Sequence, residues 1–369
     1  MKIPLVDLKV QYLSIKEDID SAIENILETT NFIGGKPIEE FEKSFASFCN
    51  KEYCVAVSSG TSALFIALKC LGIGEGDEVI TVPNTFIATT EAIKSVGAKP
   101  IFVDVEEETA LINSNKIEEK ITKNTKAIIP VHLYGNVCEM KKIEELAEKY
   151  HLEIIEDCAQ AHGAEYNGKK VPIGKIGCFS FFPAKILGAY GDAGGIVTDN
   201  EAIYNNMKLY SDHGRKIKYE HIKEGFNFRM DTLQAEILNI KMKYLNDWIK
   251  KRKKLSEKYS EAFRELKKIK ILKTKKNVKN SYYVYVIRVL NNKREEFMEF
   301  LKNKGIANAV HFPIPLNKQS VYKKEYVHQE FPISNMLAEE VLSIPLFPEL
   351  TEEQQEYIIE NIKNFDGKD

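Results

Sequence analysis

The sequence lacks several features that would place a chain in a common class at once. No apolar run among its 369 residues reaches the length of a membrane-spanning helix, and its first residues, MKIPLVDLKVQY, contain no signal-peptide core. Neither charge is in excess, because 52 basic residues balance 54 acidic ones to a net charge of -2. That balance gives no electrostatic ground for binding nucleic acid or an anionic membrane. We therefore expect a cytoplasmic protein with neither as a partner.

Paired cysteines and the common nucleotide motifs are also missing. No two of the cysteines form a C-x-x-C pair, so neither a zinc site nor a disulfide framework is indicated, and we predict no metal. The patterns G-x-x-x-x-G-K-[ST] and G-x-G-x-x-G are absent, which argues against a nucleoside triphosphatase and against a dinucleotide site. The six cysteines are Cys49, Cys54, Cys70, Cys138, Cys158 and Cys178.

Strand-like and helix-like sequence patterns alternate over residues 50–200. Short apolar runs rich in β-branched residues alternate there with amphipathic helical segments, which predicts an α/β fold with a mostly parallel sheet flanked by helices. The predicted strands are CVAVS (54–58), EVITV (78–82), KPIFVDV (99–105), KAIIPVHLYG (126–135), LEIIEDCA (152–159), GCFSFF (177–182) and GGIVTD (194–199).

After residue 234 the regular alternation of strand and helix patterns ends. A long charged helical pattern over residues 233–266 is followed by a strand-like YYVYVIRV and two further helical segments. Together with the length of the chain, this predicts a large α/β domain over residues 1–240 and a small C-terminal α+β domain over residues 241–369. The basic run at residues 250–254 is predicted to form a solvated helix face.

Open parallel sheets bind ligands at the carboxyl ends of their strands, so polar residues at those ends are the first candidates for a site. The stretch SSGTS (58–62) lies between a predicted strand and a predicted helix. Its small residues and the unpaired N–H groups of a helix N-terminus suit an anion such as a phosphate, at Gly60, Thr61 and Ser62. The same stretch equally fits a simple N-cap turn.

Two further strand ends carry reactive groups. LEIIEDCAQ ends in Glu156 and Asp157, whose functional interpretation requires a partner cation. FSFFPAKILGAYGDAGG places Lys185 between an aromatic strand and a glycine-rich loop. A partly desolvated lysine has a lowered pKa, and its neutral amine is the form that makes a Schiff base. A surface lysine is the alternative interpretation.

The three strand ends together favour pyridoxal phosphate chemistry. This cofactor needs a phosphate cradle, a lysine that bonds to its aldehyde, and an acid that keeps its pyridine nitrogen protonated. SSGTS, Lys185 and Asp157 provide one of each.

With these residues in view, the chain resembles the DegT/DnrJ/EryC1/StrS family of sugar-nucleotide aminotransferases, pyridoxal-phosphate enzymes of the aspartate-aminotransferase fold (fold type I). The resemblance covers nearly the whole chain. It is carried by IPLVDLKVQY, NFIGGKPIEEFEKSFASFC, SSGTSALFIALKCLGIGEGDEVITVPNTFIAT, PVHLYGN, EDCAQAHGAEYNGKKVPIGKIGCFSFFPAKILGAYGDAGGIVT, GFNFRMDTLQAEIL, HFPIPLNKQ and LFPELTEEQ.

The resemblance implies roles for individual residues. Lys185 would bond to the cofactor and Asp157 would face its ring nitrogen, so these two are the predicted catalytic residues. Asn227 would reach the cofactor phosphate of a neighbouring subunit, which implies a homodimer with shared sites. The other implied cofactor contacts are Gly60, Thr61, Ser62, Phe86, Gln160 and Ser180, and the implied substrate contacts are His311, Arg229 and Tyr190.

The implied reaction moves an amino group from L-glutamate to a nucleotide-linked ketosugar, with pyridoxamine phosphate as the intermediate cofactor form. The G-D-x-G that follows Lys185 resembles the branch acting on C-3 ketones, and we expect a dTDP-3-keto-6-deoxyhexose. A UDP-linked 3-keto sugar and a 4-keto sugar nucleotide are the alternatives. Phe182, Ile186 and Phe312 depart from the residues usual in relatives. The sugar specificity is therefore less firmly implied than the type of reaction.

Two functions of other classes stay open from the sequence. The first is a non-catalytic regulator that keeps the fold, against which Lys185, Asp157 and Ser180 all argue. The second is a nicotinamide-dependent oxidoreductase, which the α/β alternation alone suggests and the missing G-x-G-x-x-G disfavours. Bound-cofactor colour would separate these functions from an aminotransferase.

Overall fold

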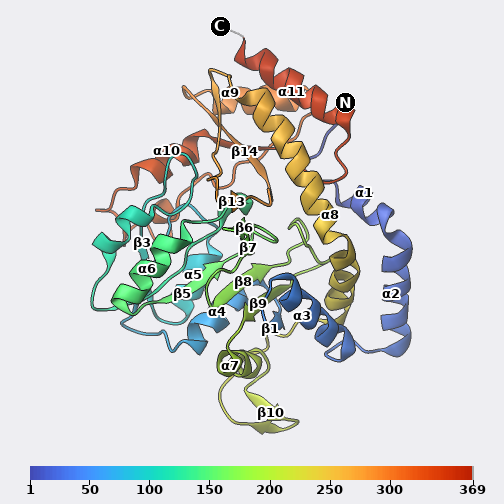
Figure 1. Cartoon of the computed structure of the whole chain (residues 1–369), viewed down its shortest axis with the longest axis vertical. Coiled ribbons are helices and arrows are strands. Elements are labelled where there is room, and N and C mark those ends of the chain that lie inside the picture. The colour runs from blue at the N-terminus through green and yellow to red at the C-terminus, as the bar shows by residue number, and fades with distance from the viewer. Residues whose placement is uncertain (368–369) are drawn as a thin grey trace.

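The computed structural model describes residues 1–367, and a seven-stranded sheet lies at their centre (Figure 1). The strand order is β1-β9-β8-β5-β4-β2-β3. Neighbours from β8 to β3 are parallel, whereas β9 runs antiparallel to both β1 and β8. The predicted α/β class with a mostly parallel sheet is therefore confirmed. The strands are β1 (Tyr53–Val57), β2 (Glu78–Thr81), β3 (Lys99–Phe102), β4 (Thr125–Ile128), β5 (Glu153–Asp157), β8 (Ile176–Ser180) and β9 (Gly194–Thr198).

Helices cover both faces of this sheet because its strands are apolar on both sides. In β1, Val55 and Val57 pack with the helices α4, α5 and α7, while Cys54 and Ala56 belong to the core on the opposite face, with α3, α6 and α8. The bounds of these helices are α3 (Lys36–Phe48), α4 (Gly60–Cys70), α5 (Ala88–Ser95), α6 (Met140–Tyr150), α7 (Glu201–Ser211) and α8 (Thr232–Phe263).

A second, smaller core lies at the end of the molecule that carries both termini (Figure 1). Its antiparallel sheet has the order β12-β14-β15. Ile3 forms a bridge with Ile306 and is buried in this core, so the first residues of the chain pack with its last elements. The elements here are β12 (Ile269–Ile271), β14 (Tyr285–Val289), α9 (Arg294–Asn303), β15 (Val341–Ile344) and α11 (Glu352–Asp366). Helix α10 (Pro332–Glu340) instead packs into the main core through Leu337.

Helix α8 joins the two cores and runs diagonally across the molecule (Figure 1). It passes through residue 240, and the division of the chain into domains at that residue stays a prediction. The basic run on this helix is not wholly solvated as predicted, because Arg252 is buried and donates hydrogen bonds to the carbonyls of Tyr283 and Leu346. A helix face repeats every 3.6 residues, so a run of five basic residues cannot stay on one side.

Smaller elements complete the chain. The hairpin β10–β11 projects from the body at the end opposite the C-terminal elements (Figure 1). Within residues 1–367, no helix combines the length and the apolarity that crossing a membrane requires. The remaining elements are α1 (Leu8–Ser14), α2 (Lys16–Thr29), β6 (Glu165–Tyr166), β7 (Lys169–Lys170), β10 (Arg215–Ile217), β11 (Glu220–His221) and β13 (Val278–Lys279).

Candidate active site

A cavity of about 320 Å³ lies where the carboxyl ends of β5 and β8 meet the N-terminus of α4. This is the edge of a parallel sheet at which ligands bind in α/β folds. Of the twelve residues predicted for the site, eight line the cavity although they come from distant parts of the sequence. They are Gly60, Thr61, Phe86, Asp157, Gln160, Ser180, Lys185 and His311.

Lys185 follows β8 on a tight turn. Its N–H donates to the carbonyl of Phe182 at 2.8 Å, and its Nζ lies 4.5 Å from the ring centroid of Tyr283. Burial lowers the pKa of the Lys185 amine to about 8, while the nearby Asp157 carboxylate acts in the opposite direction. A substantial fraction of the amine is therefore neutral near pH 8, and the neutral form is the nucleophile and base.

Asp157 ends β5 and is 6% exposed. Its Oδ1 accepts from the Ala159 N–H at 3.1 Å, and its Oδ2 accepts from the Thr89 hydroxyl at 3.0 Å. Burial raises the pKa of the carboxyl, whereas these two donors and the Lys185 amine lower it. A carboxylate held in this way suits a cationic partner, such as a protonated ring nitrogen.

The N-terminus of α4 forms a second wall of the cavity. Ser59 and Ser62 close a capping box, in which the Ser62 N–H donates to Ser59 Oγ and the Ser59 N–H donates to Ser62 Oγ. The first turn of a helix leaves further N–H groups without intrahelical partners, and here these belong to Gly60 and Thr61. A side chain at Gly60 would stand 2.8 Å from Ser180 Cβ, so glycine permits the helix to approach β8.

Three further predicted residues line the cavity with an amide, an aromatic ring and an imidazole. Gln160 Oε1 accepts from the Tyr134 N–H at 2.8 Å, which leaves the amide nitrogen as its donor. The half-exposed ring of Phe86 lies 5.9 Å from that of Phe312. Ser343 Oγ is 2.8 Å from His311 Nδ1, and burial lowers the pKa of this histidine.

Four predicted site residues do not line this cavity. The Ser62 hydroxyl donates to the Ser59 carbonyl within the cap, and Tyr190 packs against α8 in a separate apolar cluster. Arg229 pairs with Asp212 at 2.6 Å and lines another cavity. Asn227 is exposed and forms a β-bridge with Asp212.

Other residues of the cavity were not predicted. Thr89 contacts Asp157 directly, and Tyr283 faces Lys185 from the C-terminal part of the chain. The signal for Thr89 is its place in NTFIATT, one helical turn after Thr85, with which it makes a hydroxyl contact of 3.3 Å. Tyr283 precedes a strand in YYVYV without a marker of its own, and Ser59 and Asp192 complete the polar lining.

Comparisons with known proteins identify the family of the chain. Residues 13–363 match the DegT/DnrJ/EryC1/StrS aminotransferase family. The chain belongs to this family. The solved structure of S. venezuelae DesV in complex with a ketimine intermediate superposes with a TM-score of 0.97 at 33% identity, covering 100% of this chain and 99% of that one. The structure of ntda from Bacillus subtilis with bound cofactor pmp has a TM-score of 0.92 at 33% identity and covers 100% of this chain and 86% of that one.

Curated relatives of this aminotransferase carry different names. The "Pleiotropic regulatory protein" of Geobacillus stearothermophilus is 40% identical over 99% of both chains. The dTDP-3-amino-3,6-dideoxy-alpha-D-galactopyranose transaminase of Aneurinibacillus thermoaerophilus is 39% identical over 98% of this chain and 99% of its own. The UDP-N-acetyl-3-dehydro-alpha-D-glucosamine 3-aminotransferase of Acidithiobacillus ferrooxidans is 40% identical over 95% of both chains.

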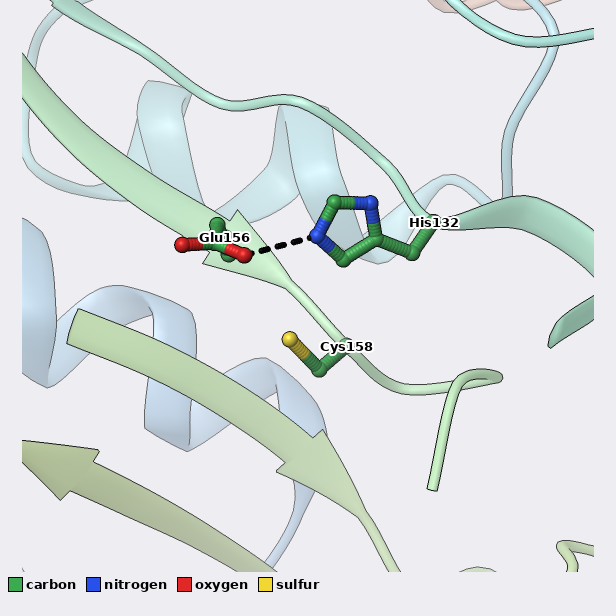
Figure 2. Close-up of side chains that lie close together, drawn as sticks. All are labelled: His132, Glu156 and Cys158. Atoms are coloured by element: carbon green, nitrogen blue, oxygen red, sulfur yellow. Dashed lines mark hydrogen bonds and ion pairs between the residues drawn. The ribbon is translucent and has the colours of Figure 1, made fainter. Parts of the chain in front are cut away.

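Glu156 and Cys158, on either side of Asp157 in the sequence, form a fully buried cluster with His132 (Figure 2). Their ligand atoms lie within 4.8 Å of one another, as in many metal sites. However, Glu156 Oε2 already accepts from His132 Nε2 at 2.8 Å and from the Ile173 N–H at 2.9 Å, and Oε1 accepts from the Gly174 N–H at 2.5 Å.

The pair of His132 and Glu156 therefore has a structural use. The His132 N–H donates to the carbonyl of Asp157 at 3.0 Å, and the Asp157 N–H donates to the carbonyl of Pro130. Glu156 and His132 thus tie the segment after β4 and the segment before β8 to the end of β5, which carries the Asp157 carboxylate.

Proposed function

We propose that this chain transfers an amino group from L-glutamate to a nucleotide-linked 3-keto sugar, with pyridoxal phosphate as its cofactor. The observation that carries the proposal is the meeting of Lys185 and Asp157 in one cavity that also contains the N-terminus of α4. A nucleophilic amine, a buried carboxylate and an anion cradle match the three parts of this cofactor.

Each part of the cofactor has a matching residue in the cavity. The N–H groups of Gly60 and Thr61 and the hydroxyl of Ser180 would hold the phosphate, because a helix N-terminus favours an anion. Asp157 would pair with the protonated ring nitrogen, Gln160 would donate to the ring oxygen, and Phe86 would cover the ring face. The bound cofactor supplies an aldehyde that takes up the amino group and a ring that accepts the electron pair released at the substrate carbon.

Lys185 would carry the proton during both halves of the reaction. Its Nζ accepts a proton from the α-carbon of the donor, and in the second half it delivers a proton to the sugar carbon that receives nitrogen. A base works best when its pKa lies near the operating pH, and the pKa of about 8 meets that condition. Asp157 keeps the ring nitrogen protonated throughout.

The favoured acceptor is a dTDP-3-keto-6-deoxyhexose. Its support is the G-D-x-G that follows Lys185 at Gly191–Gly194 and the similarity to the dTDP-sugar transaminase of Aneurinibacillus thermoaerophilus. A UDP-linked 3-keto sugar is the second candidate, which the 40% identity to the Acidithiobacillus ferrooxidans enzyme favours. Steady-state assays with each 3-amino sugar nucleotide and 2-oxoglutarate, run in reverse, distinguish the two by their kcat/KM.

A homodimer with shared sites completes the proposal. Asn227 does not line the cavity of its own chain and is exposed, so its side chain is accessible to a neighbouring subunit. The exposed apolar residues of the projecting hairpin, Ile217, Tyr219 and Ile222, would become buried in such an assembly.

The visible absorption spectrum tests the reaction class. Wild-type protein saturated with pyridoxal phosphate should show a visible band that L-glutamate bleaches, and Lys185→Ala should lose both the band and turnover. Lys175→Ala, which changes an exposed lysine before the first residue of β8, should behave as wild type. A cofactor band that survives in Lys185→Ala, or a wild-type protein that takes up no cofactor, would contradict the proposal and favour a regulatory role.

A further inference from the structure

Helix α8 places a lysine beneath the turn that carries Lys185. Lys241 is 0% exposed, and its Nζ donates to the carbonyl of Gly188 at 2.6 Å. The same nitrogen lies 4.1 Å from the ring centroid of Tyr190. Lys241 of α8 thus contacts the loop at Gly188, three residues beyond Lys185.

A second polar side chain of α8 holds the same loop. Gln234 lies two helical turns before Lys241, on the same face of the helix, and its Oε1 accepts from the Tyr190 N–H at 2.9 Å. A side chain at Gly191 would stand 2.9 Å from Gln234 Nε2, so the backbone is pressed against this amide. Two side chains of one helix therefore fix consecutive parts of the loop.

The loop itself is a closed turn. The Lys185 N–H donates to Phe182, and the Ala189 N–H donates to the carbonyl of Phe181 at 2.7 Å. A side chain at Gly188 would meet the Pro183 carbonyl at 2.2 Å, so only glycine fits inside the turn. Because the turn is compact, a displacement of its Gly188 end would also displace Lys185.

No ion pair accounts for the burial of the Lys241 side chain. No carboxylate of residues 1–367 lies within 4.0 Å of its Nζ, and Glu349, the acid that acts on it, does so at longer range. Burial lowers the pKa of Lys241 to about 7. An apolar side chain of similar volume would avoid the desolvation of the amine, so stability alone does not account for lysine at this position.

We propose that Lys241, together with Gln234, is a positioning residue that sets the orientation of Lys185 through the 183–191 turn. The relevance to catalysis rests on the proposed function of Lys185. The positioning itself can be measured without any turnover, in the cofactor-free protein. Failure of the proposed function and failure of this inference are therefore distinguishable.

Amide hydrogen exchange of the cofactor-free protein is the first readout. Lys241→Met removes the donor and keeps an unbranched side chain, and we expect the amides of Ala189 and Tyr190 to exchange about ten- to a hundredfold faster. Amides of β5 should keep their wild-type rates. Lys241→Arg retains a charged donor and should restore slow exchange. Lys243→Met, the same change at an exposed position of α8, is the matched control.

The second readout is the visible circular dichroism of the protein saturated with pyridoxal phosphate, which depends on how the ring is oriented. We expect a changed signal in Lys241→Met, with kcat lowered about tenfold and the KM for L-glutamate changed less than about twofold. If Lys241→Met fails to fold, Gln234→Met should still accelerate exchange at Tyr190. Uniformly faster exchange throughout the chain, unchanged exchange in the turn, or an arginine variant that behaves like methionine would overturn the inference.

Discussion

At Asp157, burial and hydrogen bonding act on the same carboxyl in opposite directions. Burial raises its pKa, whereas the Thr89 hydroxyl and the Ala159 N–H stabilise the charged form. In the proposed function a carboxylate must stay ionised to hold a proton on a ring nitrogen, so these two donors would support that chemistry although neither reacts. Thr89 is buried, and its hydroxyl donates to Asp157 Oδ2.

Thr89→Val tests this contribution. Loss of one hydrogen bond to the carboxylate should raise the pKa of Asp157 and lower kcat about tenfold, because such a bond contributes about 1–2 kcal/mol. Thr90→Val is the control, since the buried Thr90 hydroxyl donates only to the Ile87 carbonyl of its own helix. Steady-state kinetics of both variants provide the comparison, and equal losses in the two would assign the effect to helix α5 instead.

Lys185 also predicts a dependence of stability on pH. Its pKa is about 8 in the folded protein and 10.5 without burial, so from pH 8 to pH 10.5 the unfolded chain binds more protons than the folded one. The contribution of Lys185 to the free energy of unfolding therefore rises with pH between pH 8 and pH 10.5. In cofactor-free protein, Lys185→Met should be more stable than wild type at pH 7 by on the order of 1–2 kcal/mol, since solvent screens part of the effect.

That advantage should disappear as the pH approaches 10.5. Urea denaturation of both proteins at a series of pH values measures the difference, from which other titrating groups such as Lys241 cancel. Lys243→Met should run parallel to wild type at every pH, because its side chain is exposed. A Lys185→Met difference that stays constant from pH 7 to pH 10.5 would show that the folded protein does not depress the pKa.

Among the elements, the contact between α4 and β9 shapes the proposed anion cradle. A side chain at Gly194 would stand 2.3 Å from the carbonyl carbon and oxygen of Ser59, which are backbone atoms that cannot rotate away. Gly194→Ala should push β9 from the start of α4, destabilise the fold by about 1–3 kcal/mol and weaken pyridoxal phosphate binding at least about tenfold.

Cofactor titration and urea denaturation test Gly194→Ala. Gly74→Ala is its control, because a side chain there would meet the carbonyl of Val96 at an ordinary 3.6 Å. Should both variants bind the cofactor as wild type does, the helix N-terminus would not be the phosphate cradle.

Elements with a strong local pattern could be predicted from the sequence. The apolar runs predicted all seven strands of the central sheet, although the run at 126–135 was predicted seven residues beyond the end of β4 at Ile128. The strand-end rule brought Lys185, Asp157 and Gly60 to one edge. Side-chain direction could not be predicted in the same way. The Ser62 hydroxyl is used by the helix cap and Tyr190 turns toward α8, and both choices depend on neighbours that the local sequence does not contain.

Contacts across the whole molecule were the least predictable. Tyr283 reaches the cavity from beyond residue 280, and Lys241 and Arg252 are buried on a helix whose other lysines are mostly exposed. Burial of a charged residue depends on which carbonyls surround it, and those of Gly188, Tyr283 and Leu346 lie far from α8 in sequence. No periodic pattern in the sequence indicates long-range packing of this kind.

The proposed dimer leads to a prediction at the scale of the assembly. If Lys185 and Asn227 of one site come from different subunits, Lys185→Ala and Asn227→Asp should each be poorly active alone, the second because an added carboxylate repels the phosphate. A dimer formed from one copy of each variant contains one intact site and one doubly altered site. Half of the dimers in a random equimolar mixture are of this kind, so the mixture should recover about a quarter of the wild-type activity.

The two variants are unfolded together, refolded at equal concentrations with pyridoxal phosphate, and assayed against each variant refolded alone. Refolded wild type sets the full activity. Lys185→Ala mixed with Lys175→Ala should reach about half of it whether or not subunits exchange, which shows that the Lys185→Ala chain does not interfere with refolding of an intact one. Recovery near a quarter supports shared sites, because neither chain contributes a complete site by itself. No recovery above the two separate variants would mean that Asn227 serves the cavity of its own chain or none, and the shared-site dimer would be wrong.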